Sequence, residues 1–141
     1  MNLSGVFPPV TTPFDDRGRV VSGALASNLA RYEAHGAAGY LLLGSTGEAA
    51  YLEEGEKLEV LCAARRAVPA GRILMAGVGL ESTAATVRLA ALAADCGADL
   101  ALVITPFYFR SGMNEEALRP KAFRRGSPKI VLAWTAGGNA L

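Results

Sequence analysis

The nine residues YLLLGSTGE (40–48) join an apolar run to a loop that holds two glycines and two adjacent hydroxyl side chains. A helical pattern opens near Leu52, so this stretch predicts a strand, a loop and a helix. Glycine allows backbone conformations that a Cβ would forbid, and the loop amides and hydroxyls can donate hydrogen bonds to an anion. The loop alone leaves two interpretations open: a site for a carboxylate or phosphate, or a turn formed for local reasons.

Apolar runs and helical patterns alternate on both sides of this stretch. Five apolar runs predict strands, at residues 5–10, 39–43, 73–78, 99–104 and 129–134. Apolar residues at helical spacing predict the helices between them, at about 22–34, 52–66, 83–96 and 113–123. We expect Ser22 to cap the first helix and Ser82 or Thr83 to cap the third. Strands separated by helices of this length favour right-handed crossovers and a parallel sheet.

Polar and glycine-containing segments follow four of these strands, at residues 11–12, 44–48, 77–81 and 105–110. In a (β/α)8 barrel all such segments converge on one face. A complete barrel needs eight strands and about 250 residues, whereas this chain of 141 residues supplies five strands. The pattern therefore leaves open a partial barrel and a small open α/β sheet.

Composition narrows the range of partners. The net charge is +1 with both signs mixed along the chain, so nucleic acid and acidic membrane surfaces are not expected partners. No apolar run approaches the roughly 20 residues of a membrane span, and residues 1–5 lack the layout of a signal peptide. We therefore expect a cytoplasmic protein that binds a small molecule.

The cysteines and the histidine exclude several chemistries. Cys62 and Cys96 fall in predicted helices without CxxC or metal-ligand spacing, so we expect buried, reduced thiols. His35 is the only histidine, which excludes a histidine-based triad or a multi-histidine metal site. Neither a metal nor a cofactor is expected.

Three blocks of the sequence resemble the pyruvate-dependent aldolase family that includes dihydrodipicolinate synthase, N-acetylneuraminate lyase and 4-hydroxy-2-oxoglutarate aldolase. The blocks are GVFPPVTTPF (5–14), GSTGE (44–48) and TPFY (105–108), and the segment 77–83 also fits. The resemblance covers about residues 3–118, the first half of the barrel in that family. It implies an α/β fold, a partial TIM (β/α)8 barrel of about five strands and four helices, with residues 1–118 as the half-barrel.

The same resemblance implies a reaction and a set of site residues. Family members form a Schiff base between a lysine and a 2-oxo acid such as pyruvate. The loop that matches Ser45, Thr46 and Gly47 holds the pyruvate carboxylate. The tyrosine that matches Tyr108 comes from a neighbouring subunit and extends the proton relay. The resemblance therefore implies a lyase or aldolase without a cofactor and a homo-oligomer.

The chain departs from the family in its lysines. Lys57 and Lys121 fall on predicted outer helices, and Lys129 opens a strand at the end away from the active face. None fits the family's Schiff-base amine on the sixth strand. Trp134 stands near the place of the fifth-strand tyrosine, and an indole N–H cannot serve as an acid–base group near neutral pH. We therefore expect no turnover from this chain alone.

The end of the chain departs from the family as well. Residues 119–141 no longer resemble it and are expected to form a divergent tail, as a reading-frame slip or premature stop would produce. The unpaired edges of a half-barrel favour dimers, larger oligomers or aggregates. Two alternatives to a truncated lyase stay open: a non-catalytic half-barrel that binds a small carboxylate or phosphate, and an unrelated open-sheet domain that binds phosphate.

Overall fold

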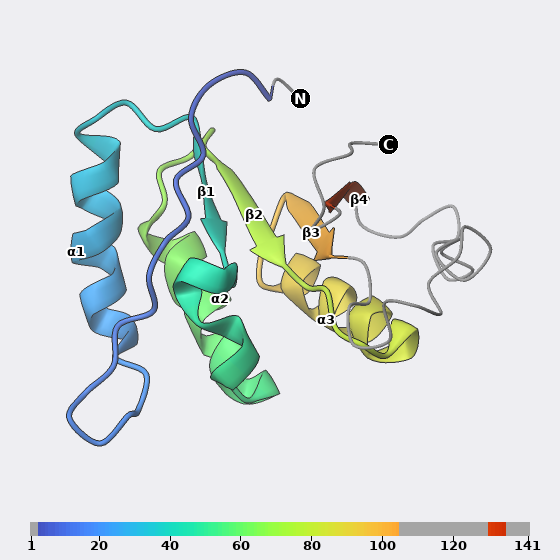
Figure 1. Ribbon diagram of the computed structural model, residues 1–141. Coiled ribbons are helices and arrows are strands. Elements are labelled where there is room, and N and C mark those ends of the chain that lie inside the picture. Colours follow the sequence, from blue (N-terminus) through green and yellow to red (C-terminus); the bar gives the residue numbers. More distant parts are fainter. Residues whose placement is uncertain (1–2, 105–129, 135–141) are drawn as a thin grey trace.

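The computed structural model describes residues 3–104 and 130–134, and Figure 1 shows their arrangement. The helices are α1 (Ser22–Glu33), α2 (Glu54–Ala67) and α3 (Thr83–Asp95). The strands are β1 (Gly39–Leu42), β2 (Ile73–Gly77), β3 (Leu100–Ile104) and β4 (Ile130–Trp134). Two short 3-10 turns, η1 (Ser45–Gly47) and η2 (Ala49–Tyr51), lie between β1 and α2. The expected helix at 113–123 lies outside the described residues.

The four strands form one parallel sheet in the order β1-β2-β3-β4. Because the spatial order equals the chain order, every right-handed crossover extends the sheet in the same direction and places its helix on the same face. The helices follow the strands in turn, as Figure 1 shows. A doubly wound sheet would instead reverse its strand order. The arrangement is that of a barrel segment, which confirms the predicted partial barrel.

The expected first strand is not a regular strand. Residues 5–10 run beside β1, where they make one isolated parallel bridge between Pro9 and Leu41. The hydrogen bonds run from Ala38 N to Val6 O, from Leu41 N to Pro8 O and from Val10 N to Leu41 O. Proline has no N–H to donate, so Pro8 and Pro9 interrupt a ladder that these residues would otherwise complete. The segment nevertheless covers the edge of β1.

The two faces of the sheet carry different side chains. Tyr40, Leu42, Leu74 and Ala76 belong to the buried core cluster together with residues of the three helices, such as Leu25, Leu61 and Leu89. The alternate positions, which pair as Leu41 with Met75 and Gly77 with Leu102, belong to the opposite face. In a barrel this second face points to the interior. The apolar runs that appeared continuous in the sequence thus serve two separate faces.

The helix termini largely follow the sequence. Ser82 caps α3 by accepting a hydrogen bond from Ala85 N at 3.4 Å, as predicted. Gly36 follows α1 with a φ of 75°, a conformation that favours glycine. Ser22 is not the cap of α1, because the helix begins at Ser22 and Val21 precedes it.

The expectation of two reduced thiols is wrong. Cys62 of α2 and Cys96, directly after α3, form a disulfide with a Cα–Cα separation of 4.7 Å. Both side chains are half-buried. The cysteines are 34 residues apart, and no local pattern could show that their two helix surfaces meet. The disulfide joins two consecutive helices of the outer layer.

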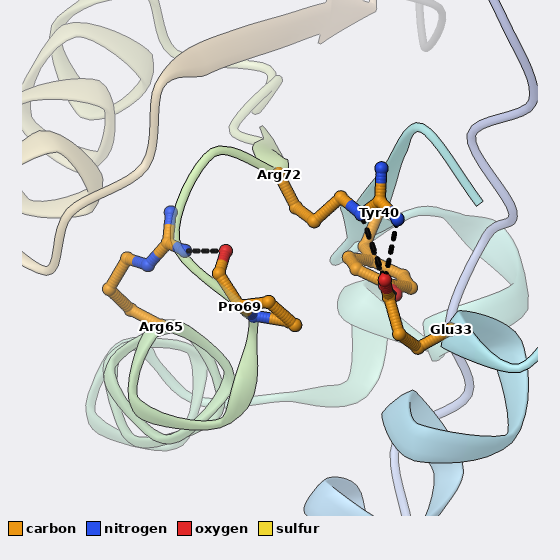
Figure 2. Close-up of polar contacts among 5 residues, drawn as sticks. All are labelled: Glu33, Tyr40, Arg65, Pro69 and Arg72. Carbon is orange, nitrogen blue, oxygen red and sulfur yellow. Dashed lines mark hydrogen bonds and ion pairs between the residues drawn. The ribbon is translucent and has the colours of Figure 1, made fainter. Parts of the chain in front are cut away.

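A polar cluster holds the end of the sheet where the strands begin (Figure 2). Tyr40 OH donates to Glu33, the last residue of α1, and Arg72 makes an ion pair with the same carboxylate at 2.6 Å. Nearby, Arg65 of α2 donates to the carbonyl oxygen of Pro69 at 3.3 Å and contacts Asp99. In (β/α)8 barrels this end of the strands serves stability, and the opposite end carries the site.

Candidate functional site

The loop after β1 adopts an unusual backbone conformation. Leu43 and Glu48 have φ values of 58° and 54°, the left-handed region that non-glycine residues rarely adopt. These two residues flank Gly44–Gly47 on both sides. Such conformations cost free energy and persist at sites where the surrounding structure imposes them. The loop is therefore more constrained than an ordinary strand-to-helix turn.

Neighbouring segments fix this loop. Thr12, which is buried, donates from Oγ1 to Gly47 O at 2.7 Å. A Cβ at Gly47 would lie 2.9 Å from Val10 O, and one at Gly77 would collide with the carbonyl group of Leu43. Glycine at these two positions lets the first segment and β2 approach the loop closely. The first three strand exits thus meet at one place, as the barrel topology predicts.

Some hydrogen-bond donors of the loop have a protein acceptor, and others have none among the described residues. Gly47 N donates to Gly44 O and Glu48 N to Ser45 O, both at 3.0 Å. In the described part of the chain, the amides and hydroxyls of Ser45 and Thr46 donate to no protein acceptor, and both side chains are exposed. Adjacent free amides and hydroxyls form a site that can accept a carboxylate or phosphate. The free donors belong to Ser45 and Thr46, while Gly47 is buried and shapes the turn.

These donors open onto a pocket of about 680 Å³. Its walls are mostly apolar and come from the barrel-interior face of the sheet, including Leu41, Leu102 and Ile104. Ser45, Thr46 and Gly79 contribute at the strand ends, and Lys57 and Leu89 contribute from α2 and α3. Apolar pockets with a few converging polar groups are the usual form of small-molecule sites.

Lys57 does not occupy the exposed outer position that the sequence predicted. Only 9% of it is exposed, and it lines the pocket that Ser45 and Thr46 also line. Its Nζ donates to Leu52 O, between η2 and α2. The sequence did contain a signal, because Lys57 shares a helical stripe with the buried residues Val60, Leu61 and Ala64.

The structure does not describe the side chains of the other predicted site residues. Tyr108, Lys121 and Lys129 lie outside the described residues, and for Trp134 only its place in β4 is described. Between residues 3 and 104, no cluster of three histidine, cysteine or carboxylate side chains could hold a metal. No helix in this part of the chain is long and apolar enough to cross a membrane.

The parallel sheet in chain order, with a constrained donor loop at its carboxyl edge, is typical of (β/α)8-barrel enzymes. The chain belongs to the dihydrodipicolinate synthetase family, whose model matches residues 2–117. This result confirms the family that the three sequence blocks indicated.

Individual proteins of known name are also similar to this chain in sequence. A 4-hydroxy-tetrahydrodipicolinate synthase of Xylella fastidiosa is 44% identical over 111 residues, which are 78% of this chain and 36% of the relative. One from Natronomonas pharaonis is 40% identical over 75% of this chain and 36% of its own length. The chain therefore spans little more than a third of these relatives.

Solved structures match the fold over the same part. The dihydrodipicolinate synthase of Acinetobacter baumannii, complexed with pyruvate, has a TM-score of 0.77 and 29% identity over 83% of this chain and 40% of that one. A prophage protein of the same family from E. coli K12, also in complex with pyruvate, has a TM-score of 0.76 and 28% sequence identity. The match covers 82% of this chain and 38% of that one.

Proposed function

We propose that this chain is the N-terminal part of a Schiff-base lyase or aldolase for 2-oxo acids. In this proposal the amides and hydroxyls of Ser45 and Thr46 bind the substrate carboxylate, Gly47 shapes the loop, and Tyr108 serves the proton relay. The observation that carries the proposal is the pair of residues with free donors on a constrained loop. Two of the family's solved structures hold pyruvate, which supports a pyruvate-like ligand.

The proposed loop would orient the 2-oxo acid without supplying the chemistry. Hydrogen bonds to a carboxylate are charge-assisted, and apolar walls strengthen them by excluding water. Cleavage of a carbon–carbon bond next to a carbonyl also needs an electron sink, which a protonated imine with a lysine provides. We expect no turnover from this chain alone, because its sequence provides no lysine at the family's Schiff-base position.

A second candidate is a non-catalytic half-barrel that binds a small carboxylate or phosphate. The same free donors support it, since they suit either anion. A thermal melt with pyruvate or with inorganic phosphate separates the two ligands. Borohydride treatment with radiolabelled pyruvate then tests for an imine, because only an imine is reduced to a stable adduct. A labelled adduct together with release of 2-oxo acid from 4-hydroxy-2-oxoglutarate would contradict the expected inactivity.

Thr46 provides a direct test of carboxylate binding. Thr46→Val keeps the side-chain shape and removes the hydroxyl donor, so pyruvate affinity should fall by about 1 to 3 kcal/mol. Isothermal titration calorimetry measures the change. Thr11→Val is the matched control, because Thr11 is exposed and does not line the pocket. An affinity that stays the same in Thr46→Val would remove Thr46 from the site.

We also propose how the chain is divided, how its copies associate and where it is located. Residues 1–118 would form the half-barrel and 119–141 the divergent tail, and copies of the chain would associate through the open barrel face. We also infer a cytoplasmic location, where glutathione would reduce the Cys62–Cys96 disulfide of this structure. Trapping thiols by alkylation in intact cells tests the location, since reduction would leave Cys62 and Cys96 open to alkylation. Protection of both cysteines would argue for an oxidising compartment.

A further inference from the structure

We propose that Lys57 forms a second anion subsite in the pocket, so that the pocket favours a 2-oxo acid with a second acidic group over pyruvate. The inference rests on the proposed function, because it assigns the first carboxylate to Ser45 and Thr46. The second acidic group is a carboxylate or phosphate at the far end of a short molecule.

The burial of Lys57 is exceptional among the charged side chains that the structure describes. It is 9% exposed, whereas no other lysine, arginine or carboxylate of residues 3–104 is buried. A buried charge without a counter-ion costs free energy, and proteins usually pair such groups.

No carboxylate of the described residues 3–104 provides that counter-ion. The ion pairs of the described residues all use arginine: Arg19 with Asp15, Arg65 with Asp99, Arg72 with Glu33 and Arg88 with Glu54. Glu81 also lines the pocket, but it is exposed and lies beyond ion-pair distance of Lys57. A ligand anion could therefore provide the missing charge.

One hydrogen bond holds the Lys57 side chain in place. Nζ donates to Leu52 O, and this one bond to a neutral acceptor leaves the other ammonium protons without a partner among the described residues. The bond also anchors the side chain, which lowers the entropy lost when a ligand binds. In an apolar pocket an ammonium attracts an anion more strongly than it would in water.

Lys57 and the loop donors come from different elements. Lys57 comes from α2, whereas Ser45 and Thr46 belong to η1, and all three residues line the same pocket. Two anion-binding groups on different elements of one pocket suit a molecule with two acidic ends. Pyruvate has one carboxylate and could use only one of them.

Calorimetric titrations of the full chain with pyruvate and with 2-oxoglutarate test the inference. The wild type should bind 2-oxoglutarate about tenfold more tightly than pyruvate, the effect expected of one charge-assisted hydrogen bond. Lys57→Gln should reduce this preference to about twofold or less, and Lys57→Arg should retain it. Thr46→Val should weaken both ligands by a similar factor.

A wild-type measurement keeps the test independent of how the variants fold. Inorganic phosphate should compete with 2-oxoglutarate more strongly than sodium chloride of equal ionic strength does. Equal affinity for the two acids, or an unchanged preference in Lys57→Gln, would overturn the inference alone. Failure of the wild type to bind either acid would overturn the proposed function as well. A borohydride-stable pyruvate adduct on Lys57 would show an imine-forming amine and would also refute the anion subsite.

Discussion

Tyr40 shows how one buried side chain links three elements of the fold. Its ring belongs to the core, and its hydroxyl group donates to Glu33, which Arg72 also contacts (Figure 2). Burial, followed by the hydrogen bond to Glu33, raises the pKa of Tyr40 to about 12. The hydrogen bond from Arg72, followed by that from Tyr40, lowers the pKa of Glu33. The cluster therefore requires a neutral phenol and an ionised carboxylate.

Alkaline pH should weaken this cluster. Because the pKa of Tyr40 is raised on folding, the stability that its neutral form contributes is present below pH 10 and is lost as the pH rises toward 12. Tyr40→Phe should remove this loss from the pH dependence of urea unfolding. Tyr51→Phe is the control, because Tyr51 is 84% exposed. Identical alkaline profiles for the wild type and Tyr40→Phe would contradict the prediction.

Thr12 is the residue that connects the first segment to the candidate site. Thr12→Val removes the donor to Gly47 O and leaves a buried carbonyl without its partner, so the chain should lose about 1 to 3 kcal/mol of stability. Pyruvate binding should weaken too, because the loop loses a support. Urea unfolding and calorimetry measure the two effects, with Thr11→Val as the exposed neighbour for comparison. Normal stability in Thr12→Val would show that the loop does not depend on this bond.

At the scale of the elements, the sequence predicted the strands and helices from residue 22 to residue 104 because their hydrophobic periods are regular. The sequence-based predictions were wrong at positions where two distant segments of the chain meet. The alternation of Tyr40 and Leu41 between two faces depends on β2 and on the helix layer, which the apolar run does not reveal. The orientation of Lys57 depends on the pocket beside α2 in the same way. The candidate loop could be predicted, and for the buried lysine beside it the signal was the helical stripe shared with Val60, Leu61 and Ala64 rather than its residue type.

The disulfide between Cys62 and Cys96 gives the prediction for the helix layer. A cross-link across 34 residues restricts the unfolded chain and should contribute about 3 to 4 kcal/mol. A reducing agent, or the variant Cys62→Ser, should therefore lower the melting temperature of the oxidised chain. The Cys62→Ser variant should then be insensitive to the reducing agent, which serves as the internal control. Equal melting temperatures with and without reducing agent, after mass spectrometry has verified the bond, would refute this stabilisation.

The barrel-interior face of the sheet affects how copies of the molecule associate. In the described part, the helices cover one face of the sheet, and the other face contributes the apolar residues Leu41, Leu102 and Ile104 to the pocket. These three side chains are half-buried, and apolar surface that the helices leave uncovered promotes association. Residues 5–10, which the sequence predicted as one open edge, cover β1 and contain prolines that cannot extend a ladder. We therefore expect copies to associate through the interior face.

Sedimentation velocity over a range of concentrations tests this association. The wild type should form dimers or larger species whose fraction grows with concentration. Leu102→Arg places a charge in the apolar pocket wall and should shift the equilibrium toward monomers, since a buried unpaired charge opposes association. Ala84→Arg adds the same charge on an exposed position of α3 and should leave the distribution unchanged. A monomeric wild type with a sharp, cooperative thermal transition would instead indicate that the chain forms a complete small domain whose second face needs no partner.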